Sequence, residues 1–236
     1  VGKVLFGLLK PETGEVLKDQ KEPVKSASWA VRHGIGYVSK NRDQESLMLI
    51  SSIADNICLP SLKDLTPFGP ISDRKQKQLA EKWSERMEVK ADSVKVFCNT
   101  LSGGNKQKVV VAKWLGKGSD IMILDCPTRG IDVGTKAAIY QLIMQMKEEG
   151  KSILLISEEL QELIGMSDRI VLLRDGAVSG EFLRNEGLTS EVNTENDLRG
   201  EQDGKQQSVR DSKNKHKRIV GKQFRIPGSD ISSCII

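Results

Sequence analysis

Two short segments of the sequence carry residues suited to nucleotide chemistry. Asp125 directly follows the apolar run 121–124. A carboxylate at the end of a buried strand can hold Mg²⁺ beside phosphates, because this hard cation prefers oxygen ligands. Ser102, Gly103, Gly104 and Asn105 precede a helical stretch, and the free backbone N–H groups at a helix start, together with the helix dipole, attract phosphate. Each segment alone has a plainer interpretation, as a helix cap.

The chain around these segments alternates between short apolar runs and amphipathic helices. Strands are predicted at 35–38, 121–124 and 153–156, helices at 26–33, 104–115 and 159–164, and a hairpin at 169–173 and 177–182 with its turn at 175–176. A further helix follows residue 132, with Ile139, Leu142, Ile143 and Met146 on one face. This alternation predicts an α/β fold with a mostly parallel sheet and helices on both faces. Ligands bind such sheets beyond the carboxyl ends of the strands.

Residues 51–98 interrupt the alternation. Leu79, Trp83 and Met87 recur at helical spacing within a strongly charged stretch, which predicts an amphipathic helix. Three prolines before it, at 60, 67 and 70, exclude one continuous helix. The segment therefore reads as a helical insertion in the α/β fold.

Charge and composition narrow the class of protein. The net charge is +4, but residues 199–236 contain nine of the 36 Lys and Arg and only four of the 32 Asp and Glu. The remaining 198 residues are close to neutral, so nucleic acid is not expected as a partner. No apolar run approaches the roughly 18 residues of a membrane-spanning helix. The four cysteines form no CxxC pair, and this argues against a zinc ribbon or a disulfide framework.

The two segments gain weight in combination. Residues 101–108 (LSGGNKQK) are followed by Ile123-Leu124-Asp125 and by 127–132 (PTRGID). Together they resemble the ATPase domains of ABC transporters, and in particular the second, C-terminal ATPase half of tandem subunits that energise ribose-, galactose- and xylose-type sugar importers. Residues 156–160 and 165–170 are similar to the same subfamily. The resemblance covers residues 1 to about 185.

This resemblance implies a P-loop NTPase-like fold, with ATP and Mg²⁺ as cofactors. It implies a partial ATPase core at 1–50, a helical subdomain at 51–98, the signature helix with the rest of the core at 99–185, and a polar basic tail at 186–236 that we expect to be disordered. Asp125 is the implied magnesium ligand. The implied nucleotide-binding residues are Ser102, Gly103, Gly104, Asn105, Lys40 and Asp132. Asp132 is equally well explained as a helix cap.

The implied partners follow from the same resemblance. They are a second ATPase domain, in tandem or on a separate chain, the membrane permease subunits and, indirectly, a sugar-binding protein. The expected location is peripheral, at the cytoplasmic face of the inner membrane. The sugar cannot be named, because selectivity resides in other subunits.

The sequence departs from the family pattern at several catalytic positions. It contains no GxxxxGK[ST] phosphate loop, and residues 1–7 look like the helix that follows this loop, so we expect an N-terminally truncated domain. Cys126 stands where the family has a catalytic glutamate, and a thiol is a poor base toward water. Glu158 falls at the usual histidine position, and Lys40 replaces the usual glutamine or glutamate. Alone, the chain is expected to be inactive.

A domain whose own nucleotide pocket cannot hydrolyse ATP can still function in a pair of ATPase domains. In this family ATP lies between two domains, with the P-loop of one facing the signature turn of the other, so the 102–105 turn is expected to complete a partner's site. Two other interpretations stay open. One is a soluble ABC ATPase acting in translation or DNA repair, and the other is a non-functional remnant.

Overall fold

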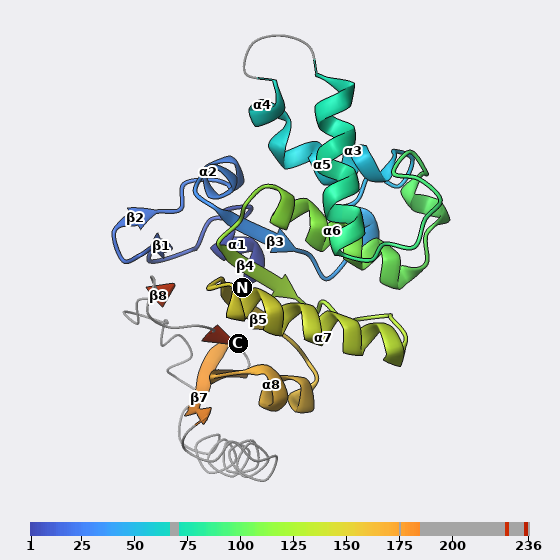
Figure 1. Ribbon diagram of the computed structural model, residues 1–236. Coiled ribbons are helices and arrows are strands. Elements are labelled where there is room, and N and C mark those ends of the chain that lie inside the picture. Colours follow the sequence, from blue (N-terminus) through green and yellow to red (C-terminus); the bar gives the residue numbers. More distant parts are fainter. Residues whose placement is uncertain (67–70, 175, 185–224, 227–233, 236) are drawn as a thin grey trace, which may run out of the picture.

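A six-stranded sheet crosses the molecule, with the strand order β3-β4-β5-β9-β6-β7 (Figure 1). The structure is a computed structural model that describes residues 1–66, 71–174, 176–184, 225–226 and 234–235. β3, β4, β5, β9 and β6 are parallel, and β7 runs antiparallel to β6. The predicted mostly parallel sheet is confirmed. Its strands are β3 (Ile35–Val38), β4 (Ile121–Asp125), β5 (Ser152–Ile156), β6 (Arg169–Arg174), β7 (Ala177–Leu183) and β9 (Cys234–Ile235).

Helices lie at the predicted stretches 26–33, 104–115 and 159–164, after residue 132 and along the Leu79 to Met87 stripe. In the described residues no helix has the length and apolar character needed to cross a membrane. A second, small sheet has the order β2-β1-β8, and the turns η1, η2 and η3 connect larger elements. The helices are α1 (Gly2–Leu5), α2 (Ala27–Arg32), α3 (Ile53–Cys58), α4 (Leu62–Leu65), α5 (Asp73–Arg86), α6 (Gly103–Gly116), α7 (Val133–Glu148) and α8 (Leu160–Met166). The other elements are β1 (Leu17–Lys18), β2 (Glu22–Pro23), β8 (Arg225–Ile226), η1 (Arg42–Ser46), η2 (Leu59–Ser61) and η3 (Cys98–Thr100).

Helices cover both faces of the sheet, as predicted. Side chains alternate between the faces along a strand, and two neighbours on β3 show what each face contacts. A Cβ on Gly36 would lie 2.9 Å from Cβ of Trp114, so this face packs closely against α6. The ring of Tyr37 stacks on Phe6, which directly follows α1, at 5.4 Å between centroids. The parallel register leaves the carboxyl ends of β3, β4 and β5 at one edge.

The helical insertion forms a separate layer beyond α6. α3, α4 and α5 lie at the end of the molecule away from β6 and β7 (Figure 1), and α3 packs against α5 and α6. A capping box between Ser52 and Asp55 starts α3. The predicted stripe on α5 is confirmed, because Leu79 and Trp83 pack against the core and Met87 is buried. The insertion is therefore attached to the sheet mainly through the signature helix, α6.

The tail differs from its predicted disorder at two places. Arg225–Ile226 pairs with β1, and Cys234–Ile235 lies in parallel between β5 and β6. Because β9 separates β5 from β6, it satisfies backbone groups on both facing edges. The sequence pattern gives no sign of such short distant pairings. The rest of the tail lies outside the described residues, as do Asp175 of the predicted hairpin turn and residues 67–70.

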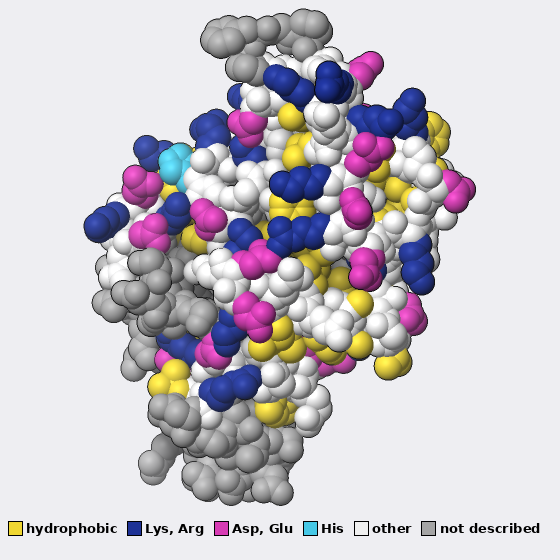
Figure 2. Space-filling model, viewed as in Figure 1, with side chains coloured by type: hydrophobic (Ala, Val, Ile, Leu, Met, Phe, Trp, Pro, Cys, Tyr) yellow, Lys and Arg dark blue, Asp and Glu magenta, His cyan; other side chains and the backbone are white. Residues whose placement is uncertain are grey.

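Charged side chains of both signs are interspersed over the face shown in Figure 2. The ion pairs of the described residues include Lys77 with Glu81 and Arg86 with Glu149. Exposed ion pairs of this kind add little stability.

The close contact between β3 and α6 can be tested with a single methyl group. Gly36→Ala would place Cβ 2.9 Å from Trp114 and 3.0 Å from Sδ of Met122. Overpacking in a dense core lowers the free energy of unfolding by about 1–3 kcal/mol. Gly165→Ala in α8 is the matched control, since its Cβ would meet no atom within 4 Å, and we expect it to raise stability by up to about 1 kcal/mol. Urea unfolding of the full chain measures both, and equal stability of the two variants would contradict this packing.

Candidate functional site

The first turn of α6 presents Ser102 at the surface. Its hydroxyl oxygen accepts from the backbone N of Asn105 at 3.4 Å and from Nδ2 of the same residue at 3.1 Å. Asn105 also accepts, through Oδ1, from the backbone N of Lys90 at 2.9 Å. Within the described residues, no bond was found for the amides of Gly103 and Gly104, which are first-turn donors without an intrahelical acceptor. The turn is thus a capped helix start with an exposed serine, and its two glycine amides lack an intrahelical acceptor although Gly104 is buried.

Both glycines of this turn are closely packed, and Gly104 more tightly than Gly103. A Cβ on Gly103 would lie 2.8 Å from Nη2 of Arg42 and 3.3 Å from the carbonyl oxygen of Gly130. A Cβ on Gly104 would lie 2.5 Å from Cγ2 of Thr135 on α7. Real Cβ atoms do not approach neighbours this closely. The glycines therefore seat the first turn of α6 directly against α7 and the loop before it.

Asp132 ends that loop and caps α7. Its carboxylate accepts from the backbone N of Thr135 at 2.9 Å and from the Thr135 hydroxyl at 2.7 Å. These hydrogen bonds hold the pKa of Asp132 below its ordinary value. Thr135 is the same residue that packs on Gly104. The structure thus brings Asp132 and the signature turn together through one threonine, and the cap interpretation of Asp132 holds.

Asp125, the predicted magnesium ligand, lies half-buried at the end of β4. The hydroxyl of Tyr37 donates to its Oδ2 at 3.1 Å. Burial, and next the charge of Asp125, raise the pKa of Tyr37, so Tyr37 stays a neutral donor. A Cβ on Gly2 would lie 3.5 Å from the same oxygen, which places the start of α1 beside this carboxylate.

Cys126 follows in a left-handed backbone conformation with φ of +48°. Its N–H donates to the carbonyl oxygen of Ile156 at 2.8 Å, which ties the end of β4 to β5. Burial first, and then the charge of Asp125, raise the pKa of the thiol. Near neutral pH Cys126 is therefore a neutral thiol and not a base.

Lys40 and Glu158 form an ion pair across the end of β4. Lys40 follows β3 and Glu158 follows β5, and Nζ of Lys40 donates to Oε1 of Glu158. The contact raises the pKa of Lys40 and lowers that of Glu158. Cys126 interacts electrostatically with both. The three positions that depart from the family pattern are therefore neighbours at the carboxyl ends of three adjacent strands.

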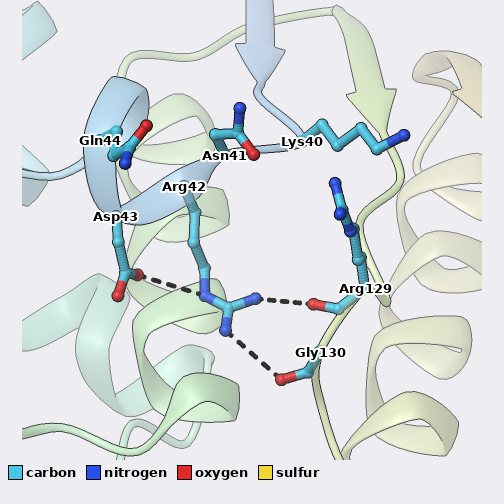
Figure 3. Close-up of a pocket in the computed structure, with 7 residues that line it drawn as sticks. All are labelled: Lys40, Asn41, Arg42, Asp43, Gln44, Arg129 and Gly130. Atoms are coloured by element: carbon cyan, nitrogen blue, oxygen red, sulfur yellow. Dashed lines mark hydrogen bonds and ion pairs between the residues drawn. The ribbon is translucent and has the colours of Figure 1, made fainter.

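A hollow of about 280 Å³ lies between the turn after β3 and the loop after β4, with Lys40 on its wall (Figure 3). Sequence reasoning found Lys40 on its wall but missed Arg42 and Arg129. Arg42 follows the end of β3, and Arg129 lies within the 127–132 motif. Because ligands bind such sheets beyond the ends of the strands, these positions were the signal that could have identified both arginines. The hollow is lined by Lys40, Asn41, Arg42, Asp43, Gln44, Arg129 and Gly130.

The described residues do not make up a magnesium site by themselves. No group of three or more His, Cys, Asp or Glu residues gathers to hold a metal in this part of the chain. Asp125 already accepts from Tyr37, Glu158 is paired with Lys40, and the thiol of Cys126 is a soft ligand that Mg²⁺ does not favour. Asp125 is thus the one predicted metal ligand, and no second carboxylate joins it.

Comparisons with known proteins agree with this arrangement. The Ribose import ATP-binding proteins of Bacillus licheniformis and of Bacillus subtilis (strain 168) are each 40% identical to this chain over 193 residues, or 81% of this chain and 39% of the relative. The chain therefore spans about two fifths of the length of these curated relatives.

Solved structures resemble the fold. A dimeric post-hydrolysis state of an ATP-binding cassette bound to ADP and Pi gives a TM-score of 0.66 at 24% identity, covering 77% of this chain and 78% of that one. The ADP conformation of a second cassette gives 0.63 at 18% identity, covering 78% of this chain and 75% of the other. These likenesses confirm the predicted ABC ATPase fold.

The family itself is shown by sequence. The match to the family described as "ABC transporter" runs over residues 1–129, more than half of the 236 residues. It includes the end of β3, the signature turn and the end of β4, whereas Asp132, Thr135 and Glu158 of the site lie beyond the matched residues. This chain belongs to the ABC transporter family.

Proposed function

We propose that this chain is one ATP-binding half of a sugar-import ATPase, and that its signature turn completes an ATP site whose P-loop belongs to a second ATPase domain. The observation that carries the proposal is the first turn of α6. Ser102 is exposed there, the amides of Gly103 and Gly104 are free in the described structure, and the turn is seated rigidly on α7. ATP on the partner domain supplies the γ-phosphate that these groups receive.

In this arrangement each residue of the turn has a defined task. The Ser102 hydroxyl and the amides of Gly103 and Gly104 donate to phosphate oxygens, and the dipole of α6 adds to their attraction. Asn105 orients the hydroxyl of Ser102 through its 3.1 Å contact. Asp132 fixes the start of α7 beneath the turn. Such preorganised donors act on the charge that develops in the transition state.

The chain's own half of the pair has a different task. Cys126 replaces a general base, and Lys40 is neutralised by Glu158, so we assign no hydrolysis to this half. Asp125 and Lys40 contribute polar groups toward a nucleotide bound there, while Mg²⁺ enters the active half together with ATP on the partner domain. The pair then has one hydrolytic site and one that only binds.

The permease contact is proposed for a surface of the helical insertion. Ile50 is 84% exposed and Phe97 54% exposed. The two segments adjoin, because Ser52 and Phe97 form a bridge and the N–H of Asn99 donates to the carbonyl oxygen of Leu49 at 2.9 Å. Exposed apolar side chains grouped in this way are typical of a protein interface. A role in sugar import is proposed because the relatives are named ribose import ATP-binding proteins. With it we propose a peripheral position at the cytoplasmic face of the membrane.

The proposal that residues 102–105 complete an ATP site of a second domain is tested by Ser102→Arg. The full chain is mixed with the part of the Bacillus subtilis relative outside the matched segment, and ATP hydrolysis is measured. We expect the chain alone to be inactive, the mixture to hydrolyse ATP, and Ser102→Arg to lower kcat by at least about 100-fold, because a bulky cation fills the phosphate position and a donor is lost.

Ser72→Arg is the matched control. Ser72 caps α5 as Ser102 caps α6, so the loss of a cap is the same while the signature turn stays intact. Normal hydrolysis by the Ser102→Arg mixture would refute the trans site. An inactive wild-type mixture would favour the non-functional remnant.

The proposal that Cys126 does not act as a base is tested by alkylation of its thiol. With its pKa raised by burial and by Asp125, Cys126 is protonated at pH 7, and its labelling by iodoacetamide is expected to rise as the pH increases above 9. Glu158→Gln removes a negative charge and should speed labelling at a fixed pH of about 8, whereas Lys40→Gln should slow it. Peptide mass spectrometry resolves Cys126 from the other cysteines. Equal labelling at pH 8 and pH 10 would contradict this assignment.

A further inference from the structure

Arg42 on η1 lies between the loop after β4 and the first turn of α6. In the proposed function these two segments face a partner domain. Nη1 of Arg42 donates to the carbonyl oxygen of Arg129 at 2.9 Å, and Nη2 lies 3.5 Å from that of Gly130 (Figure 3). The same Nη2 is 2.8 Å from the position that a Cβ on Gly103 would take. The guanidinium therefore touches the loop after β4 and the first turn of α6 at the same time.

Arg42 is itself held in place by the turn that carries it. Its side chain is 16% exposed, and its Nε lies 3.5 Å from Oδ1 of Asp43. Oδ2 of Asp43 accepts from Nζ of Lys106 on α6 at 2.9 Å. At the other end of η1, the ammonium of Lys113 donates to the carbonyl oxygen of Ser46. Because both ends of η1 are fastened to α6, the guanidinium has a fixed position against the helix.

We propose that Arg42 is a positioning residue that holds the backbone of residues 129–130 against the first turn of α6, so that this turn and the loop meet a partner's nucleotide in one geometry. This rests on the proposed function. Arginine suits the task because its planar fork carries several donors at fixed angles and reaches two carbonyl groups. Lysine has a single ammonium that cannot reproduce the fork. A misplacement of about 1 Å at a catalytic group can cost 100-fold in rate.

The experiment compares Arg42→Ala and Arg42→Lys in the mixture used for Ser102→Arg. We expect Arg42→Ala to lower kcat at least tenfold and to leave the KM for ATP within twofold, because the P-loop of the partner domain holds ATP. Arg42→Lys should recover part of kcat by reaching one carbonyl oxygen. Arg86→Ala is the matched control, since it removes another arginine and its contact with Glu149 on the surface, and it should leave kcat unchanged.

Hydrogen exchange of the full chain without a partner gives a second, independent measurement. In Arg42→Ala the amides of residues 103–106 and 129–132 should exchange faster, while those of β4 should not change. Wild-type kcat in Arg42→Ala, or equal losses in Arg42→Ala and Arg86→Ala, would overturn the proposal, as would unchanged exchange in both segments. If Ser102→Arg has no effect on hydrolysis, the proposed function fails, and the exchange result still decides whether Arg42 ties the two segments.

Discussion

The contact between the first turns of α6 and α7 is the constraint on which the rest of this site depends. Gly104 lets Thr135 approach to a distance that no side chain would allow, and Thr135 in turn receives the cap from Asp132. Two helix starts are thereby fixed side by side, each with the positive end of its helix dipole. Because this packing has already oriented the donors, they need no reorganisation when a phosphate binds.

The carboxyl ends of β3, β4 and β5 carry a different chemistry from the two helix starts. Three positions that carry catalytic groups in the resembling family are occupied by Lys40, Cys126 and Glu158. They compensate one another: the cation and the carboxylate pair above a neutral thiol. An exposed pair adds little to stability, so its main effect is to neutralise the charge of Lys40. In the proposed function, one surface of the chain receives phosphate, and a neighbouring one has a neutral thiol where a base would act.

Much of this could be predicted from the sequence because it depends on local patterns. Apolar periodicity predicted the strands and helices, and glycines after a serine predicted the capped turn at 102–105. Contacts between distant residues could not be predicted in the same way. Lys40 meets Glu158 across 118 positions and Arg42 meets Arg129 across 87, and neither pair has a pattern. β9 was missed for the same reason, since two tail residues carry no strand periodicity. Tyr37 was predicted only as part of a strand, and its contact with Asp125 depends on the register of β3 and β4.

The most direct measurement of the central claim is photolabelling with an ATP analogue that carries its reactive group on the γ-phosphate. The full chain is irradiated with the analogue in the presence and absence of the part of the Bacillus subtilis relative outside the matched segment, and the labelled peptides are identified. The account predicts label on residues 102–105 of this chain only when the second domain is present. Label that is absent from this turn, or that reaches it equally without the second domain, would contradict the account.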